Sequence, residues 1–386
     1  MRVAYPMRVD ALDKPGGDVL QVMRYIEEGK KPDADGQPRF EGSILGTLSA
    51  DLSCFDLVHL TNIDRPVDTY PSFIAANAAH KPILISPIHH SYEEIERYER
   101  LGRDGAVSAI SGMLTFQQLE YLRSMVRSFE YPVLASAVLR MTLSGMRKAQ
   151  REVLTGARRI LVLGEKEKND ILHDFGEIPE ERFVTLRSGF ESFADGLATS
   201  PSRDIEVCVV GRIEARKNQV SILRVLNRIG VSGVFVGGEN PKHMRYCQRF
   251  RELISKSRSR YLGQLSHEKT LALMSRARLH VSASWFEVSS LVDLEAYGAG
   301  CGIVSSQCGG TREILGDAAE YVDPGSEKSI EDGIDRMLAR VKRGNSEWGE
   351  QGPQASMLNT WSKVGDELEQ IYREALDAHR RGLTQA

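Results

Sequence analysis

The chain has 386 residues, of which 41% are hydrophobic and 27% charged, and its formal net charge is −3 at pH 7. This composition excludes a disordered or fibrous chain, and the length suits two domains. The small net charge gives no reason to expect general nucleic-acid binding. Five scattered cysteines without a C-x-x-C pair favour a reduced cytoplasm over a disulfide framework or a zinc site.

Neither a signal peptide nor a spanning helix is predicted. The N-terminal stretch MRVAYPMRVDALDKPGG has no long apolar core, and no run of 18 apolar residues occurs in the sequence. We therefore expect a cytoplasmic protein, and contact with the inner face of a membrane stays open.

Short apolar runs alternate with helical patterns along the chain. An unbroken run of this length is typical of a parallel strand buried on both faces. The alternation therefore predicts an α/β, doubly wound fold in two Rossmann-like units. The runs lie at residues 55–60, 81–86, 158–163, 181–186, 205–211, 231–238, 278–284 and 302–306.

The predicted boundary between the units is the loop 192–204, which is rich in small, polar and turn-forming residues. We assign residues 1–200 to an N-terminal domain and 201–359 to a C-terminal domain. A helical insert at about 92–151 is longer than a strand connection needs. Apolar residues at helical spacing predict a final amphipathic helix at about 360–386 that packs on an already folded unit.

The first candidate site residues in chain order are Gly16 and Gly17, between a strand and a helix. Backbone without side chains can approach a phosphate or an acceptor closely there, although a plain tight turn is the alternative. The G-x-G-x-x-G spacing is incomplete, so a dinucleotide site is not predicted. Asp33 and Asp35 form a D-x-D among Pro, Gly and Lys, which favours a turn over a metal site.

His89 and His90 follow the strand at 81–86. A histidine at the carboxyl end of a strand could contact a substrate or accept a proton. Adjacent histidines point to different sides, so we expect at most one of them to be functional. The alternative is a structural role for both.

The segment 207–226 places two cations at the end of a strand. The strand ends at Gly211, and Arg212 and Lys217 precede a helix. Ligands bind at the carboxyl edge of parallel sheets, where arginine offers phosphate a bidentate fork and lysine a point charge. The alternative is a solvated turn.

Glu287 and Glu295 stand eight residues apart around a predicted helix start. The helix should begin near Ser289 or Ser290, with serine as N-cap and Asp293 completing an S-x-x-D box. The amides of residues 288–291 would then form an anion site.

In this arrangement Glu287 lies in the loop before the helix. Glu295 lies about one and a half turns in, where a carboxylate suits paired sugar hydroxyls. The alternative for Glu287 is a charge that favours the helix dipole, and the alternative for Glu295 is a plain surface glutamate.

The predicted insert could serve an acceptor. Residues 117–160 carry eight Lys/Arg against three Asp/Glu, interleaved with apolar residues. Such a helical segment could lie on an anionic membrane surface and reach a lipid-linked acceptor. The alternative is a merely solvated basic face.

Together these residues resemble a GT-B glycosyltransferase of the retaining family 4 type, from the glycosyl transferases group 1. The N-terminal domain resembles it less closely, through Gly16-Gly17 and the segments FDLVHLTN, KPILISPIHH, LVLGEKEKNDIL and RSGFE. In the C-terminal domain the resemblance follows, in order, GRIEARKN, FVGGEN, the stretch 260–284, the E-x7-E segment, GGTREILGDAAEYVDPGS and the closing W…Y helix.

The resemblance implies two domains facing a central cleft, with the final helix crossing back to the N-terminal domain. It also implies a nucleotide-sugar donor held mainly by the C-terminal domain. The implied roles are Arg212, Lys217, Ser289, Ser290 and Leu291 at the diphosphate, Glu287 at the transferred sugar, Glu295 at the ribose, Gln264 and Leu265 at the base, His89 or His90 near the reacting centre, and Gly16 and Gly17 at donor phosphate or acceptor.

The implied activity is transfer of a hexose or related sugar from a UDP-, GDP- or ADP-sugar, with retention of anomeric configuration. The acceptor would be a saccharide or a polyprenyl-linked lipid, in polysaccharide or glycoconjugate biosynthesis. Because cations stabilise the leaving diphosphate, no metal or other cofactor is expected. The alternatives are a GT-B nucleotide-sugar epimerase and a non-catalytic nucleotide-sugar-binding subunit.

The sequence departs from the family pattern at three places. The usual glycine-aromatic-glycine after the first glutamate is Val288-Ser289-Ser290, which leaves the donor sugar open. The family histidine normally falls where Ile88 stands, and His89 is the preferred substitute, before His90. The usual asparagine-glycine after the last strand of the N-terminal domain is Ser188-Gly189.

Overall fold

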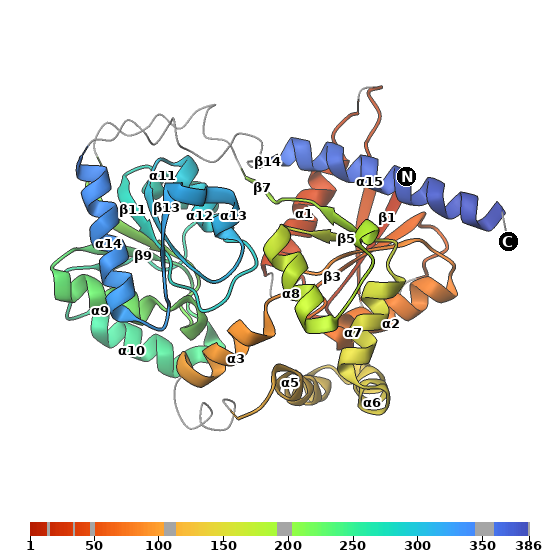
Figure 1. Ribbon diagram of the computed structural model, residues 1–386, viewed down its shortest axis with the longest axis horizontal. Coiled ribbons are helices and arrows are strands. Elements are labelled where there is room, and N and C mark those ends of the chain that lie inside the picture. The colour runs from red at the N-terminus through yellow and green to blue at the C-terminus, as the bar shows by residue number, and fades with distance from the viewer. Residues whose placement is uncertain are drawn as a thin grey trace. The chain divides into compact units, whose positions relative to one another are not determined.

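The computed structural model contains two compact units (Figure 1). Unit 1 consists of Met1–Ser91, Leu114–Gly189 and Asn359–Ala386, and unit 2 consists of Tyr92–Met113 and Phe190–Leu358. The residues that the structure describes are 1–13, 16–33, 35–46, 51–103, 113–190, 203–343 and 359–384.

Unit 1 is built on a six-stranded sheet with the order β2-β1-β3-β4-β5-β6, and every strand pair is parallel. The predicted strands at 55–60, 81–86, 158–163 and 181–186 are confirmed as β3 to β6. The strands are β1 (Arg2–Met7), β2 (Glu41–Gly46), β3 (Leu57–Thr61), β4 (Ile83–Ser86), β5 (Arg159–Val162) and β6 (Phe183–Thr185).

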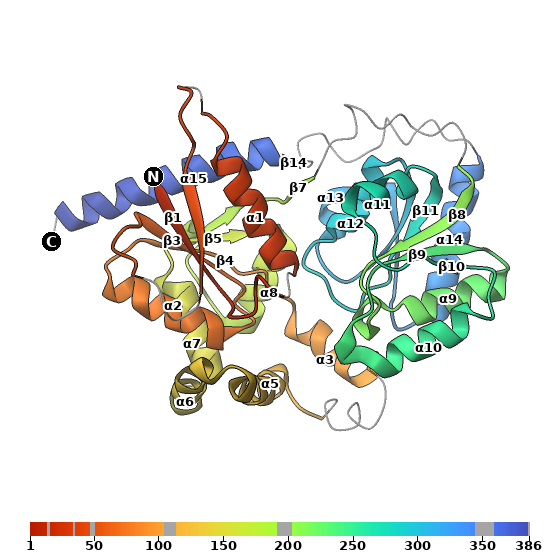
Figure 2. The ribbon, with the colours of Figure 1, turned by 180° about the vertical axis from the view of Figure 1, so that it is seen from behind.

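Helices cover both faces of this sheet (Figures 1 and 2). The first helix and the last pack together on one face, and α2 and α7 pack against each other on the other. The helices of unit 1 are α1 (Gly17–Gly29), α2 (Pro66–Ala78), α5 (Phe116–Glu130), α6 (Ala135–Ser144), α7 (Met146–Gly156), α8 (Glu165–Phe175) and α15 (Trp361–Thr384).

The final helix α15 completes the core of unit 1, which confirms the prediction that it packs on a folded unit. Val364, Leu368 and Tyr372 are completely buried against residues of β1 and α1. The Tyr372 hydroxyl lies 2.8 Å from the hydroxyl of Tyr5 and 2.6 Å from Nδ1 of His59. These bonds satisfy polar groups that would otherwise be unpaired inside an apolar core.

Unit 2 repeats the architecture with a parallel sheet of order β10-β9-β8-β11-β12-β13. Successive residues of one strand enter opposite cores: Val207 and Val209 pack on one face and Cys208 on the other. The strands are β8 (Ile205–Val210), β9 (Gly233–Val236), β10 (Arg260–Tyr261), β11 (Ala277–Val281), β12 (Gly302–Ser306) and β13 (Ala319–Val322).

The two cores of unit 2 lie under different helices, so the predicted doubly wound parallel fold is confirmed. One face carries α9 (Gln219–Ile229), α10 (Met244–Ile254) and α14 (Glu327–Lys342). The other carries α11 (His267–Met274), α12 (Leu291–Gly298) and α13 (Thr311–Leu315).

The division of the chain differs from the predicted one around α3 (Tyr92–Leu101), which belongs to unit 2. The ring of Tyr98 packs edge-on against Phe286, with centroids 5.5 Å apart, and Arg97 forms a 2.6 Å ion pair with Asp323. Only the later part of the predicted insert, with α5 to α7, belongs to unit 1. The predicted boundary loop lies almost entirely outside the described residues.

Among the described residues, no helix combines the length and the apolar character that crossing a membrane requires.

Candidate functional site

Two loops at the carboxyl edge of the unit 2 sheet approach each other closely. Gly211 follows β8 and Gly237 follows β9, and both have positive φ values, of 151° and 147°. A Cβ atom at Gly237 would lie only 2.0 Å from the carbonyl oxygen of Gly211. Glycine is therefore required there, and the loop from Gly211 to Lys217 is fixed against its neighbour.

This loop brings Lys217 to Glu287. Nζ of Lys217 donates a hydrogen bond to Oε1 of Glu287, and Nη1 of Arg216 lies 3.3 Å from Oε2 of the same carboxylate. The two segments are adjacent because β8 pairs with β11, and the amide of Trp285 donates to the carbonyl of Arg216 at 2.9 Å. The structure thus joins two predicted residues, Lys217 and Glu287, in one ionic cluster.

Arg216 was not among the predicted site residues, although it holds the cluster together. It also lies 3.2 Å from Glu214, and its guanidinium stacks over the ring of Phe286 at 5.2 Å. Burial would lower the pKa of Arg216, but the carboxylates of Glu287 and Glu214 outweigh it and raise the pKa. The sequence signal for this residue was its position next to Lys217 in a doubly basic turn.

Arg212 occupies the exposed start of the same loop. Burial would raise the pKa of Glu214, but the charges of Arg216, Lys217 and Arg212 and a 2.6 Å hydrogen bond from Asn240 lower it. Glu214 is therefore the anion that holds this basic loop together. The part proposed for Arg212 at a diphosphate stays a prediction.

Helix α12 begins after Glu287 with Ser290 as its N-cap, as predicted. The Ser290 hydroxyl accepts from the amide of Asp293 at 3.4 Å. The reciprocal half of the predicted capping box is wrong, because the Asp293 carboxylate turns into the core. It accepts there from Ser305 at 2.5 Å and lies 3.0 Å from Nε2 of His280.

The loop before α12 is backed by two glycines that follow β12. A Cβ atom at Gly309 would lie 2.4 Å from the carbonyl oxygen of Glu287, and the Gly310 amide donates to the carbonyl of Val288 at 2.8 Å. The Ser289 hydroxyl is buried and makes no hydrogen bond among the described residues. The segment Val288-Ser289-Ser290 therefore has a backbone held against the glycines, and the Ser289 hydroxyl is a buried side-chain group without a partner in the described part of the chain.

Glu295, predicted at a ribose, lies on α12 with Oε1 at 2.8 Å from Nε2 of His267. Gln264 is exposed in the loop after β10, and its Oε1 would lie 3.0 Å from a Cβ atom at Gly238. Leu265 packs partly buried against the core under α11 and α12. Their parts at ribose and base stay predictions.

In unit 1, Gly16 and Gly17 stand at the start of α1. A Cβ atom at Gly16 would lie 2.7 Å from Oδ1 of Asp18, whereas Gly17 has open space where a side chain would be. Arg8 lies 3.1 Å from Asp18 and 2.6 Å from Asp10. Arg8 is thus paired with two carboxylates, and the part of the two glycines at a phosphate or an acceptor stays a prediction.

His89 was the preferred histidine near the reacting centre, but the structure gives it a different role. Its side chain is completely buried, with Nδ1 at 2.6 Å from Asp64 and Nε2 at 2.9 Å from Asp174. Burial would lower the pKa of His89, but the two carboxylates raise it to about 10. A side chain enclosed in this way cannot touch a substrate, so we revise His89 to a structural cation.

His90 is more exposed than His89, and its part in a ligand contact stays a prediction. Its side chain is 23% exposed, and Nδ1 lies 3.1 Å from Asp64. Ile88, where the family histidine normally falls, has a φ of +48°. Such a value is an outlier for a β-branched residue and marks a strained turn at this sheet edge.

The D-x-D is a turn, as predicted. Oδ1 of Asp33 accepts from the amides of Asp35 and Gln37, both at 2.9 Å, and Gly36 has a φ of +77°. No group of three or more His, Cys, Asp or Glu side chains in the described part of the chain is placed to hold a metal ion.

Residues 198–354 match the model of the family glycosyl transferases group 1. A phosphatidylinositol N-acetylglucosaminyltransferase protein of Arabidopsis thaliana is 24% identical over 230 residues, covering 58% of this chain and 51% of that protein. The O-antigen chain mannosyltransferase B of Escherichia coli is 26% identical over 203 residues, with coverages of 48% and 52%. The chain thus spans about half the length of these relatives.

Solved structures resemble the whole chain. The sucrose-phosphate synthase of Thermosynechococcus elongatus superposes with a TM-score of 0.67 at 16% identity, covering 98% of this chain and 99% of that one. Anabaena HepE, crystallised with UDP, superposes with a TM-score of 0.65 at 14% identity, with coverages of 97% and 100%. Residues 198–354 are therefore similar to glycosyl transferases group 1, and the two parallel-sheet units of the chain have the GT-B fold.

Proposed function

We propose that the protein is a retaining glycosyltransferase that moves a hexose or related sugar from a nucleotide sugar to a saccharide or lipid-linked acceptor. The observation that carries the proposal is the cluster of Arg216, Lys217 and Glu287 at the carboxyl edge of the unit 2 sheet. It lies within the matched residues 198–354. Ligands of doubly wound sheets bind at this edge.

The chemistry follows from the charges. Breaking the bond between the anomeric carbon and the diphosphate leaves positive charge on the sugar and negative charge on the departing phosphate. Lys217 and Arg212 would stabilise the phosphate, together with the amides at the start of α12. Glu287 would face the sugar. Because fixed cations supply this stabilisation, we expect no metal requirement.

Related structures support a nucleotide sugar as donor. Crystals of Anabaena HepE contain UDP in one case and UDP-glucose in another. The named relatives from Escherichia coli and Arabidopsis are a mannosyltransferase and part of an N-acetylglucosaminyltransferase. We therefore expect a UDP-, GDP- or ADP-sugar, and the segment Val288-Ser289-Ser290 is where we expect donor choice to be made.

A panel of UDP-, GDP- and ADP-sugars tests the proposal. At least one should raise the Tm of the protein and be hydrolysed slowly without an acceptor, because water can replace the acceptor. An epimerase would instead convert the sugar without releasing nucleotide, and a non-catalytic subunit would bind without turnover. If no nucleotide sugar changes the Tm, the donor assignment is wrong.

We propose that the acceptor is reached at a membrane surface, through the apolar surface formed by α5 and α6. These helices pack side by side (Figure 1). Phe129 is 87% exposed and Leu143 81%, and Arg140, Arg147 and Lys148 are exposed near them in sequence. Apolar side chains that insert between headgroups and cations that attract anionic lipid are the two signals of interfacial binding.

Flotation with liposomes of phosphatidylglycerol and phosphatidylcholine tests this surface. The double variant Phe129→Ser, Leu143→Ser should bind at least about tenfold more weakly, since each buried apolar side chain contributes about 1.5–3 kcal/mol. Met244→Ser, which removes an exposed apolar side chain from unit 2, should bind like the unmodified protein. Equal flotation of all three proteins would exclude the α5 and α6 surface as the contact, and absence of flotation would refute membrane binding altogether.

A further inference from the structure

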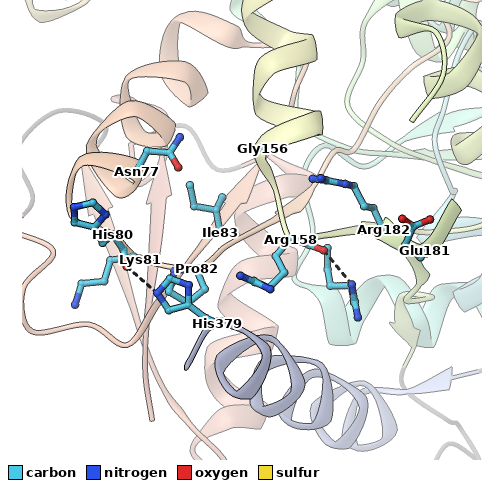
Figure 3. Close-up of a pocket in the computed structure, with 11 residues that line it drawn as sticks. Asn77, His80, Lys81, Pro82, Ile83, Gly156, Arg158, Glu181, Arg182 and His379 are labelled. Carbon is cyan, nitrogen blue, oxygen red and sulfur yellow. Dashed lines mark hydrogen bonds between the residues drawn. The ribbon is translucent and has the colours of Figure 1, made fainter. Parts of the chain in front are cut away.

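Unit 1 contains a pocket of about 470 Å³ at the amino ends of β4, β5 and β6 (Figure 3). Its lining includes Lys81 before β4, Arg158 and Arg159 at the start of β5, and Arg182 before β6. We call it the basic pocket. Four cations converge on it because three neighbouring parallel strands begin there.

These cations are held mainly by backbone carbonyls. Lys81 donates to the carbonyl of Phe55 at 2.6 Å, Arg182 to that of Ala157 at 2.7 Å, and Arg159 to that of Arg158 at 3.2 Å. A carbonyl orients a cation but does not neutralise it. The carbonyls therefore fix these cations in place without neutralising them, and among the described carboxylates Asp51 acts electrostatically on Lys81.

The side chain of Arg158 is half-buried and has no hydrogen-bond or ion-pair partner among the described residues. Glu181 is the single carboxylate in the lining, is exposed, and pairs with none of these cations in the described part of the chain. Burial, Arg159 and Arg182 lower the pKa of Arg158. The neighbouring cations and the partial burial both disfavour the charged form of Arg158, and a bound anion would offset both effects.

The basic pocket is separate from the residues predicted to meet substrate in unit 1. Gly16, Gly17 and His90 follow the carboxyl ends of β1 and β4, whereas the pocket lies at the amino end of β4. In a parallel sheet these are opposite edges. An occupant of the pocket would therefore be a second ligand of unit 1.

We propose that the basic pocket binds the phosphate group of a small phosphorylated molecule, with Arg158 as its main contact. A guanidinium with unused donors provides the bidentate fork that phosphate oxygens prefer. The volume lies within the range of small-molecule sites, and the buried Pro82 and Ile83 give the non-phosphate part of a ligand an apolar wall.

Calorimetric titration of the full chain with inorganic pyrophosphate tests the proposal. The titrations use a Lys217→Ala background, which weakens any diphosphate contact in unit 2. Pyrophosphate should bind in this background. Adding Arg158→Gln should lower the affinity for pyrophosphate by about 10- to 100-fold, since hydrogen bonds to a charged group are lost. Arg158→Lys keeps the charge and loses the bidentate fork, so its affinity for pyrophosphate should lie between that of the Lys217→Ala background and that of the Arg158→Gln variant.

Arg24→Gln is the matched control, because it also removes one arginine from unit 1 and Arg24 pairs with Glu27 on the exposed face of α1. It should leave pyrophosphate binding unchanged. Arg158→Gln should fold normally, since its side chain has no partner to lose among the described residues, and its Tm without phosphate should be equal or higher. Binding that is unaffected by Arg158→Gln, or lost equally in Arg24→Gln, would overturn the proposal.

Vesicles containing phosphatidic acid distinguish the source of the phosphate. Arg158-dependent binding of pyrophosphate assigns the pocket to a soluble molecule, and Arg158-dependent binding of the vesicles alone assigns it to a lipid headgroup. Absence of binding to both probes refutes the site. None of these measurements uses sugar transfer, so their result is independent of the activity proposed above.

Discussion

Replacing Lys217 by alanine should lower kcat by about 10²–10³-fold with little change in Tm. Removing one preorganised charge contact to a developing anion typically raises a barrier by about 2.7–4 kcal/mol. Arg216 still neutralises Glu287 in the variant, so no buried carboxylate is left unpaired. Initial rates with the nucleotide sugar identified by the donor panel, together with thermal unfolding, measure both quantities.

Lys328→Ala is the control for this experiment. It removes an exposed lysine of unit 2 that pairs with Asp332, and both rate and Tm should stay unchanged. Lys217→Arg should recover part of the lost rate, because it restores a cation. A rate for Lys217→Ala within a few-fold of the unmodified protein would show that Lys217 is not at the leaving group.

Replacing His89 by glutamine should reduce the free energy of unfolding by about 3–5 kcal/mol. Removal of one partner from a buried ionic network leaves the remaining charges uncompensated. Asp64 and Asp174 both lose their cation, and Glu167, which accepts from the His89 amide at 2.9 Å, remains buried beside them. Urea unfolding at pH 7 measures the loss.

The pH dependence of stability separates this network from simple packing. The pKa of His89 is about 10 in the folded protein and 6.5 as the ordinary value. Its contribution is therefore fully present below pH 6.5 and is lost as the pH rises through 10. Between about pH 7 and pH 10 the unmodified protein should lose more stability than His89→Gln.

His173→Gln is the control, because His173 also contacts Asp174 but its side chain is 74% exposed. It should cost little stability and keep the pH dependence of the unmodified protein. Parallel stability curves for His89→Gln and the unmodified protein would contradict an ionic role for His89.

The apolar runs predict the central strands except β1, and among the edge strands they predict only β6. A strand such as β8 is buried on both faces and appears as an unbroken apolar run. The edge strand β2, with the sequence EGSILG, is half exposed and carries no such run, and β13 is short and mixed. Edge strands bury less surface, so selection for apolar residues is weaker there.

The residues of the candidate site could be predicted one by one from the local sequence, but the contacts between them could not. Lys217 and Glu287 each follow a strand, and strand ends mark ligand sites. That they touch depends on the pairing of β8 with β11, which is a property of the sheet order. The burial of His89 depends on Asp64 and Asp174, which are 25 and 85 residues away. No local pattern announces such partners.

The packing of α15 on unit 1 has a consequence for biosynthesis. Residues near both ends of the chain share one core, where Tyr372 bonds to Tyr5 and His59. While the ribosome is still translating unit 2, the hydroxyl of Tyr5 and Nδ1 of His59 lack their partner, and the apolar face of α1 is uncovered. Domains generally fold in the order of synthesis. Here, although unit 1 is begun first, its core can close only after the strands of unit 2 have been synthesised.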